Sequence, residues 1–362
     1  MGRNGVAARP RVGLVLGAGG MLGGAWLAGA LDALAGETGL EAGSAEIVVG
    51  TSAGAAIGAL ATGGIPPCEL AAYACGRSME GLRVGWDGAT MTADAEEQRD
   101  AATGFRLARA LPLPTPGSWR MALGTLTSPH RHPPAAVVAG WLPKGPVDTR
   151  PLQDGLESVL PPGWPSGPEL WVAACDYGTG RRVAFGRRDA PPATVGEAVA
   201  ASCAMPGFYR PVRIGGRNYV DGGVCSMSNL DLVRGLGLDL VVCLNPTSSR
   251  AAVAQRSPGG LIAAAMRTAS GRRLDREAAK LRDEGTAVVL LEPADEEVRA
   301  MGWNLMRRGG REELAEQAAG TTVRALRSAA VRAELSVLRR RPTAPRRRGA
   351  PAAATHRRRQ AA

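Results

Sequence analysis

Ser52 is the residue of this sequence best suited to act as a nucleophile. It lies at the centre of Gly50-Thr51-Ser52-Ala53-Gly54, which fits the pattern GxSxG. In that pattern the serine occupies a strained turn between a strand and a helix, where side chains at the two glycine positions would collide with neighbouring backbone. A glycine-rich chain produces GxSxG by chance as well, so the flanking residues matter. Ile47-Val48-Val49 predicts the strand, and residues 55–61 predict the helix, whose N-terminal dipole favours an alkoxide.

Histidine is an improbable base for this serine. Serine–histidine–aspartate enzymes carry the histidine before the serine or after the acid, according to their fold. No histidine precedes Ser52, His130 and His132 lie in a proline-rich stretch, and His356 lies in an arginine-rich terminal segment. We therefore expect a carboxylate to activate the serine.

Asp221 is the best candidate for that carboxylate. It ends an extended segment and is followed by Gly222 and Gly223, which permit a tight turn that can direct the carboxylate toward strand ends. Asp-Gly-Gly is also a common turn with no further role. Asp176, at the end of a strand predicted for Leu170–Cys175, is the competing acid.

A second glycine-rich segment, residues 17–24, is suited to bind negative charge. Its sequence Gly-Ala-Gly-Gly-Met-Leu-Gly-Gly offers closely spaced backbone N–H groups at the start of a predicted helix. Such groups suit a phosphate or a developing oxyanion. The dinucleotide fingerprint GxGxxG requires glycine at its sixth place, where this chain has Leu22, so a nucleotide-binding oxidoreductase is a weaker alternative.

The elements that carry these motifs indicate an α/β fold. A strand, a glycine turn and a helix occur twice in the first part of the chain, which favours parallel βαβ units. The first strand and helix are predicted at Val12–Leu16 and Ala25–Leu34. Further strands are predicted at Leu170–Cys175, Arg181–Phe185, Val212–Val220, Leu238–Leu244 and Thr286–Leu291, and further helices at Val195–Ala204 and at residues 260–282.

We expect one large domain with short extensions. The chain has 362 residues and 45% hydrophobic residues, enough for one large core. Residues 11–330 form the α/β domain in this prediction, after an N-terminal extension at residues 1–10. Residues 85–145 lose the α/β rhythm and are rich in proline, so we interpret them as a cap inserted into the domain.

The net charge of +11 is concentrated in residues 339–362, which contain nine arginines and no acidic residue. This segment has too little apolar content to fold alone, and we predict a disordered tail. A tail with no partner is the commoner case. The alternative is peripheral contact with an anionic membrane, and nucleic acid would be attracted without specificity.

The cysteines and histidines give no metal-binding pattern, because the six cysteines contain no CxxC pair. Cys175 and Cys243 end apolar runs and fit buried positions in a reducing compartment, so we predict a cytoplasmic protein without metal or cofactor. The apolar stretch from Val12 to Ala35 is the best candidate for a membrane anchor. Its glycines weaken a helix by about 1 kcal/mol each, and we predict no transmembrane span.

Together these motifs resemble those of the patatin-like phospholipase family. That family has a glycine-rich loop after the first strand, a GxSxG motif about thirty residues later, and a distant Asp-Gly-Gly or Asp-Gly-Ala. Residues 17–24, 50–54 and 221–223 supply them in this order. Residues 201–208 and 176–180 also look like family segments, and the resemblance extends over residues 11–325.

The resemblance implies a three-layer α/β/α fold of the patatin type and the hydrolysis of carboxylic ester bonds in lipids. It implies Ser52 as the nucleophile and Asp221 as its base, with no cofactor. The resemblance also implies an oxyanion hole in the glycine loop, which the backbone N–H groups of Gly17, Gly19, Gly20 and Met21 would form.

One departure from the family concerns the residue after the glycine run. The family commonly has arginine or lysine there, where this chain has Leu22 and Gly23. The oxyanion hole would then consist of backbone donors alone. A patatin-like domain that binds lipid or protein without turnover is therefore the main alternative. The acyl substrate, its positional specificity and the oligomeric state stay open.

Overall fold

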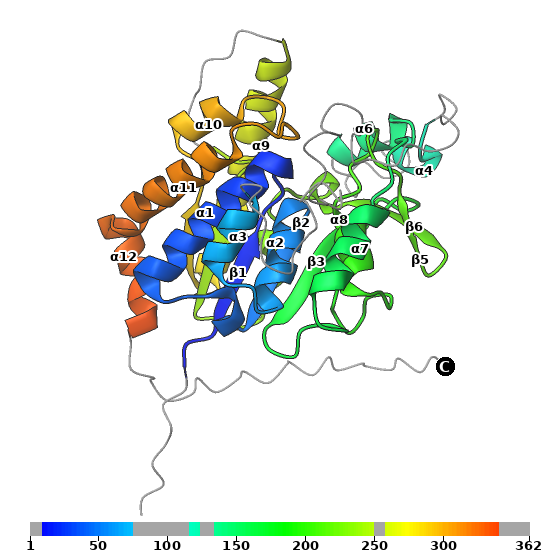
Figure 1. The fold of residues 1–362 in the computed structure, drawn as a ribbon. Coiled ribbons are helices and arrows are strands. Elements are labelled where there is room, and N and C mark those ends of the chain that lie inside the picture. The colour runs from blue at the N-terminus through cyan, green and yellow to red at the C-terminus, as the bar shows by residue number, and fades with distance from the viewer. Residues whose placement is uncertain (1–8, 75–115, 124–133, 250–257, 340–362) are drawn as a thin grey trace, which may run out of the picture.

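The computed structural model describes residues 9–74, 116–123, 134–249 and 258–339. Within these ranges the chain forms a sheet of eight strands, flanked by helices on both faces (Figure 1). The strands are β1 (Val12–Leu16), β2 (Ile47–Thr51), β3 (Glu169–Asp176), β4 (Arg182–Phe185), β5 (Val212–Ile214), β6 (Arg217–Asp221), β7 (Leu240–Leu244) and β8 (Ala287–Leu291).

The central strands of the sheet are parallel. β1 pairs with β2 and β7, β2 with β3, and β7 with β8, all in parallel register. The strands β4, β5 and β6 add antiparallel pairs around β3. The predicted α/β fold with a mainly parallel sheet is confirmed.

The helices follow the strands along the chain. They are α1 (Gly20–Thr38), α2 (Ala53–Thr62), α3 (Pro67–Ala74), α4 (Trp119–Ala122), α6 (Pro134–Trp141), α7 (Arg150–Val159), α8 (Val195–Ser202), α9 (Pro258–Asp283), α10 (Asp295–Met301), α11 (Arg311–Leu326) and α12 (Ala329–Leu335). Short 3-10 turns are η1 (Ala42–Ser44), η2 (Gly222–Val224), η3 (Leu230–Val233) and η4 (Ser336–Arg339).

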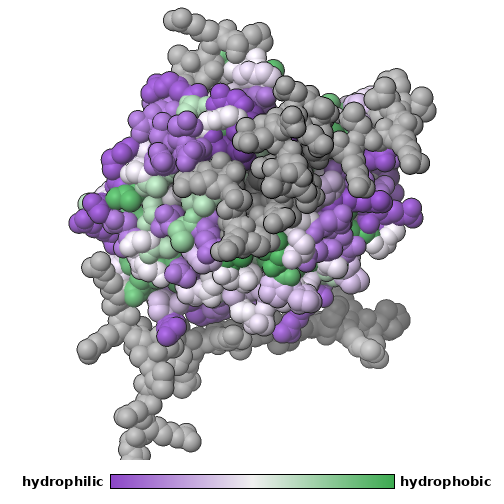
Figure 2. All heavy atoms as spheres, viewed as in Figure 1, coloured by the Kyte–Doolittle hydropathy of each residue, from purple (hydrophilic) through white to green (hydrophobic). Residues whose placement is uncertain are grey.

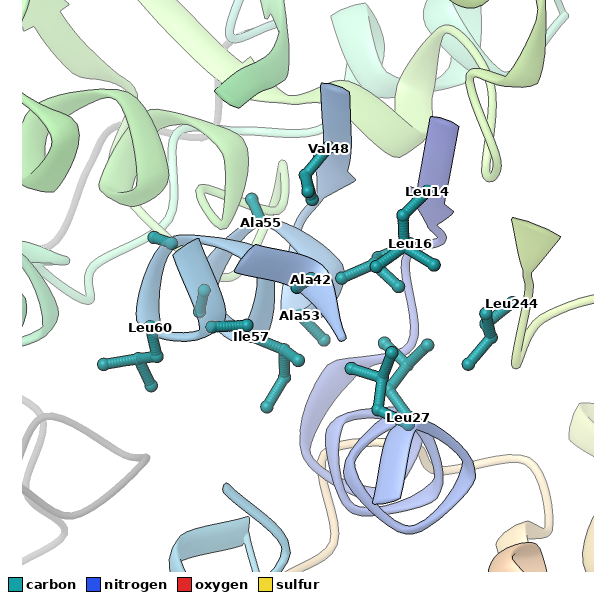
Figure 3. Close-up of a cluster of buried hydrophobic side chains, with 14 of the residues drawn as sticks. Leu14, Leu16, Leu27, Ala42, Val48, Ala53, Ala55, Ile57, Leu60 and Leu244 are labelled. Atoms are coloured by element: carbon teal, nitrogen blue, oxygen red, sulfur yellow. The ribbon is translucent and has the colours of Figure 1, made fainter. Parts of the chain in front are cut away.

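Alternate residues of the parallel strands enter cores on opposite faces of the sheet. Leu14 and Leu16 of β1 join Val48 of β2 in the core that contains side chains of α1 and α2 (Figure 3). Val15 belongs to the second core, with Leu274 of α9. Because both faces are covered, these strands are continuous apolar runs without polar alternation.

Helix α1 begins earlier than its sequence predicts. We expected residues 25–34 because glycine is a poor helix former, yet the helix starts at Gly20 and includes Gly23 and Gly24. Tertiary packing explains this difference, since glycine lets other chain segments approach closely. A β-carbon at Gly23 would lie 3.1 Å from the ring of Pro246, and one at Gly29 would lie 2.1 Å from the carbonyl oxygen of Ala315 in α11.

The single strand predicted for Val212–Val220 is wrong in one respect, because the chain reverses within it. β5 and β6 form a hairpin in which Ile214 pairs with Arg217. The two connecting residues, Gly215 and Gly216, have φ angles of 54° and 80°. Two-residue hairpin turns of this kind require positive φ at both positions, which glycine adopts readily.

The predicted cap, residues 85–145, is only partly described. Its described parts contain α4 and α6, which lie together near β5 and β6 (Figure 1). His130 and His132 lie outside the described residues, as do residues 1–8 and all but the first residue of the predicted tail. In the described ranges, no helix has both the length and the apolar character that crossing a bilayer requires.

Candidate active site

Strand β3 brings Ser52 and Asp221 together. One edge of β3 is occupied by β4, which pairs with residues 172–175. Strands β2 and β6 also pair with residues of this stretch, so both must lie along the opposite edge of β3. β2 runs parallel to β3 and reaches Thr51 opposite Ala173, whereas β6 runs antiparallel and reaches Asp221 opposite Ala174. The two strands therefore end head to head on consecutive residues of β3, and Ser52 follows directly.

Ser52 has the backbone conformation that the GxSxG motif predicts. Its φ angle is 53° and its ψ angle is −120°, between the end of β2 and the start of α2. A residue with a β-carbon is strained in this region, at a cost of about 1 to 3 kcal/mol. This backbone conformation makes a sharp turn at Ser52, and α2 begins at the next residue.

Gly50 and Gly54 are required by close backbone contacts. A β-carbon at Gly50 would lie 2.5 Å from the α-carbon of Ala55, and one at Gly54 would lie 2.2 Å from the carbonyl oxygen of Leu16. The second contact joins the start of α2 to the end of β1. Both glycines thus have the steric role that the sequence predicts.

Asp221 is buried beside Ser52 without a cation. It is 8% exposed, one carboxylate oxygen accepts the N–H of Gly223 at 2.7 Å, and the Ser52 side chain lies close enough to favour the charged carboxylate. Among the described residues, no arginine or lysine forms an ion pair with it. Burial raises the pKa of Asp221 from 3.8 to about 6, although the Ser52 side chain and the N–H of Gly223 oppose the shift.

The two glycines after Asp221 have different roles. A β-carbon at Gly222 would lie 2.2 Å from the carbonyl oxygen of Ala173, so only glycine lets the chain pass β3 at this distance. Gly223 contributes its N–H to the carboxylate. Together they fix the carboxylate over the end of β2.

The structure adds Ser202 and Cys203, to which the sequence assigned no role. The Ser202 hydroxyl accepts the N–H of Ser52 at 2.8 Å and donates to the carbonyl oxygen of Ala173 at 2.6 Å, which ties the strained residue to β3. The thiol of Cys203 also lies beside Ser52, and burial holds the pKa of this thiol well above its usual value. That thiol stays neutral, so Asp221 is the group beside Ser52 that can take up a proton.

Asp176, the competing acid, lies at the end of β3 and is also buried. Its carboxylate accepts the N–H groups of Gly178 and Thr179 at 2.8 and 3.0 Å and pairs with the guanidinium of Arg217 at 3.1 Å. These three partners occupy both carboxylate oxygens of Asp176 and hold the turn that follows β3. Ser52 is not among them.

The glycine loop connects β1 to α1 next to the start of α2. Gly20 has a φ angle of 59°, and the N–H groups of Gly19, Gly20 and Met21 have no acceptor among the described residues. An α-helix leaves its first N–H groups without intrahelical partners, and they carry the positive end of the helix dipole. These three predicted donors are free to bind an anion.

Gly17, the fourth predicted donor, is engaged elsewhere. Its N–H donates to the carbonyl oxygen of Leu244 in β7 at 2.9 Å. A β-carbon at Gly17 would lie 2.2 Å from the side-chain oxygen of Asn245, so glycine is needed there for packing. Gly17 thus places the loop, and its N–H is not available to a ligand.

A buried arginine lies behind the glycine loop. Arg267 of α9 donates to the carbonyl oxygen of Pro246 at 2.7 Å and has no carboxylate partner in the described part of the chain. Burial lowers the pKa of Arg267 to about 10. The ring of Pro246 lies against Gly19 and Gly23. Through Pro246, Arg267 therefore supports the part of the glycine loop that contains the buried Leu22. Sequence gave no signal for this arginine, because α9 contains several.

Comparison with known proteins identifies the family of this chain. The model of the patatin-like phospholipase family matches residues 14–234, more than half of the chain, and the chain belongs to that family. Among solved structures, VipD from Legionella pneumophila is similar, with 15% sequence identity and a TM-score of 0.40 over 88% of this chain and 67% of the VipD chain.

Proposed function

We propose that this protein hydrolyses carboxylic ester bonds of lipids, with Ser52 as nucleophile and Asp221 as the base. One observation carries the proposal: Asp221 is buried, has no cationic partner among the described residues, and lies beside Ser52, because β2 and β6 end on consecutive residues of β3. A base with a pKa near 6 is largely deprotonated at neutral pH and still has appreciable affinity for a proton. The choice of a lipid substrate follows from membership of the family.

In the proposed reaction, Asp221 accepts the Ser52 proton as the serine oxygen attacks the ester carbonyl. The N–H groups of Gly19, Gly20 and Met21 stabilise the negative charge on the carbonyl oxygen. The alcohol leaves with the proton, and a water molecule activated by Asp221 then hydrolyses the acyl-enzyme. Loss of one such N–H donor typically lowers the rate about 100-fold.

The proposal is tested by covalent labelling. The full-length protein is incubated with a fluorophosphonate probe, and the labelled peptide is identified by mass spectrometry. We expect labelling at Ser52, its loss in Ser52→Ala, and turnover of p-nitrophenyl esters, whose chain length is then varied. A folded protein that neither reacts with the probe nor turns over any ester would favour the alternative, a patatin-like domain that binds lipid or protein without catalysis.

We further propose that residues 339–362 contact an anionic membrane surface from the cytoplasm. The support is their nine arginines without an acidic residue, each attracted by about 1 kcal/mol near such a surface. Deletion of the tail should weaken sedimentation with anionic vesicles at low salt and leave hydrolysis of a soluble ester unchanged. Equal vesicle binding by both proteins, or full displacement by RNA at equal charge, would contradict a membrane role.

A further inference from the structure

The two described helices of the cap expose apolar side chains on their outer faces. Trp119 of α4 is 56% exposed, and Val138 and Trp141 of α6 are 60% and 52% exposed. A surface helix normally presents polar residues to water. An aromatic and aliphatic outer face is therefore unusual and indicates a binding surface.

These side chains form one patch, which we call the cap face: Trp119, Leu123, Val138, Trp141, Leu142 and Met205. The rings of Trp119 and Trp141 meet edge to face with centroids 5.9 Å apart. Leu123 lies one turn after Trp119, and Val138 one turn before Trp141. Leu142 extends the patch toward the loop that contains Met205, since it lies within 3.4 Å of a β-carbon placed at Gly207.

The inner side of the same helices is packed against the segment that carries Asp221. Met121 of α4 and Ala139 of α6 share a buried cluster with Val220 and Cys225, on either side of Asp221 in the chain. Tyr177 holds the helices in place, because its hydroxyl donates to Ala139 at 3.1 Å. The cap face is thus a fixed surface one helix layer away from the candidate site.

The charged residues around the cap face differ from those around Trp303, another exposed tryptophan. Residues 116–123 and 134–147 contain the exposed cations Arg120 and Lys144 and no acidic residue. Trp303 is 64% exposed but follows α10, whose first turn has three acidic residues. The surface over α10 and α11 is mostly hydrophilic (Figure 2).

We propose that the cap face docks onto the surface of an anionic lipid bilayer and places the candidate site at that surface. Tryptophan is favoured at the boundary between lipid headgroups and acyl chains, and flanking arginine and lysine are attracted by anionic headgroups. Acidic side chains would oppose both contacts. The inference rests on the proposed function, because a lipid esterase must reach ester bonds at such a surface.

The test measures vesicle binding and soluble turnover separately. Binding is measured by sedimentation with vesicles of equimolar phosphatidylcholine and phosphatidylglycerol, using full-length Ser52→Ala so that no lipid is hydrolysed. Sodium chloride at about 0.5 M shortens the screening length to about 4 Å and suppresses the contribution of the arginine-rich tail. Turnover of a short-chain p-nitrophenyl ester is measured in proteins that retain Ser52.

We expect the double variant Trp119→Ser/Trp141→Ser to bind vesicles at least about ten-fold more weakly than its parent and to keep its turnover of the soluble ester. Val138→Glu is a second variant with a small change in volume, and should also weaken binding. Arg120→Gln and Lys144→Gln should each weaken binding about five-fold at low salt and little at high salt. Trp303→Ser is the matched control, expected to bind like the parent.

Vesicle binding unchanged in both the double variant and Val138→Glu would overturn the proposal, as would an equal loss in Trp303→Ser. A parent dimer in sedimentation velocity that dissociates in the double variant would assign the cap face to a second copy of the chain, and would also overturn it. Absence of ester turnover in the unmodified protein would contradict the proposed function alone, since the binding measurement uses a Ser52→Ala protein.

Discussion

Two buried aspartates lie at the ends of neighbouring strands in this sheet, and they have opposite surroundings. Asp176 ends β3 and has a guanidinium and two backbone N–H groups as partners. Asp221 ends β6, accepts one backbone N–H and has the side chain of Ser52 beside it. Both end a strand, follow apolar residues and precede glycine-containing turns, so their local sequences look alike.

The difference shows how two neighbouring strands can hold one carboxylate in a turn and another, the proposed base, without a cation. A carboxylate with a cation and several N–H donors has its charge compensated by these partners, which stabilises a turn. A buried carboxylate without a cation is destabilised in its charged form, and burial raises the pKa of Asp221 to about 6. Such a group gains stability when it takes up a proton, as a general base does.

The first prediction compares the activities of Asp221→Asn and Asp176→Asn. If Asp221 is the base, its replacement should lower kcat/KM for a p-nitrophenyl ester about 1000-fold, because a positioned base contributes about 100- to 10,000-fold. Asp176→Asn should stay within a few-fold of the unmodified protein. Similar losses in both variants, with folding intact, would remove the distinction between the two residues.

The second prediction concerns stability, where the two substitutions should have opposite signs. Asp221 has a folded-state pKa of about 6 against an ordinary value of 3.8, so the folded protein binds more protons between these pH values and loses stability as pH rises through them. Asp221→Asn should therefore raise the free energy of unfolding at pH 8 by about 1 to 3 kcal/mol and have no such benefit below about pH 4. Asp176→Asn should lower it by about 1 to 3 kcal/mol. Urea titrations at pH 8 and at pH 4 measure the change in the free energy of unfolding in each variant and so give its sign.

The third prediction concerns the backbone strain at Ser52, the proposed nucleophile. Ser52→Ala and Ser52→Gly both remove the hydroxyl, but alanine keeps the β-carbon at a φ angle of 53°. Ser52→Gly should be more stable than Ser52→Ala by about 1 kcal/mol, because glycine adopts positive φ without strain. Equal denaturation midpoints would mean that the turn is not strained.

The fourth and smallest effect is expected from Arg217→Met, which removes the cation from Asp176. Arg217 is largely exposed, so the loss should be below about 1 kcal/mol. The substitution leaves Asp176, like Asp221, without a cationic partner among the described residues. Ester turnover should nevertheless not change, since Asp176 does not contact Ser52. A gain or loss of turnover greater than a few-fold would link Asp176 to the reaction.

Much of this arrangement follows from local sequence. The GxSxG motif, the glycine loop and the Asp-Gly-Gly turn have mechanical requirements that single residues reveal, so the elbow, the sheet class and the order of elements were predictable. The choice between Asp176 and Asp221 is weaker, because it depends on a hairpin that the sequence predicts as one strand and that brings Arg217 to Asp176. Without that reversal, neither acid can be placed relative to Ser52.

Contacts between distant segments were not predictable. Ser202 reaches the N–H of Ser52 from a helix 150 residues later, and nothing in its alanine-rich surroundings indicates this bond. Gly17 looked like an anion ligand because its N–H belongs to a glycine run, but the end of β7 occupies that N–H. In both cases the packing of segments that are distant in the chain, which local patterns do not encode, decides the partner.

The central claim is that Asp221, and not Asp176, takes the proton of Ser52. It is tested most directly by the rate of fluorophosphonate labelling at Ser52 between pH 4.5 and pH 8.5 in the unmodified protein, Asp176→Asn and Asp221→Asn. We predict that the rate rises with pH through an apparent pKa of about 6 and then levels in the first two proteins, while Asp221→Asn is slow and shows no such rise. A pH-independent rate in the unmodified protein, or the same rise in Asp221→Asn, would contradict the account.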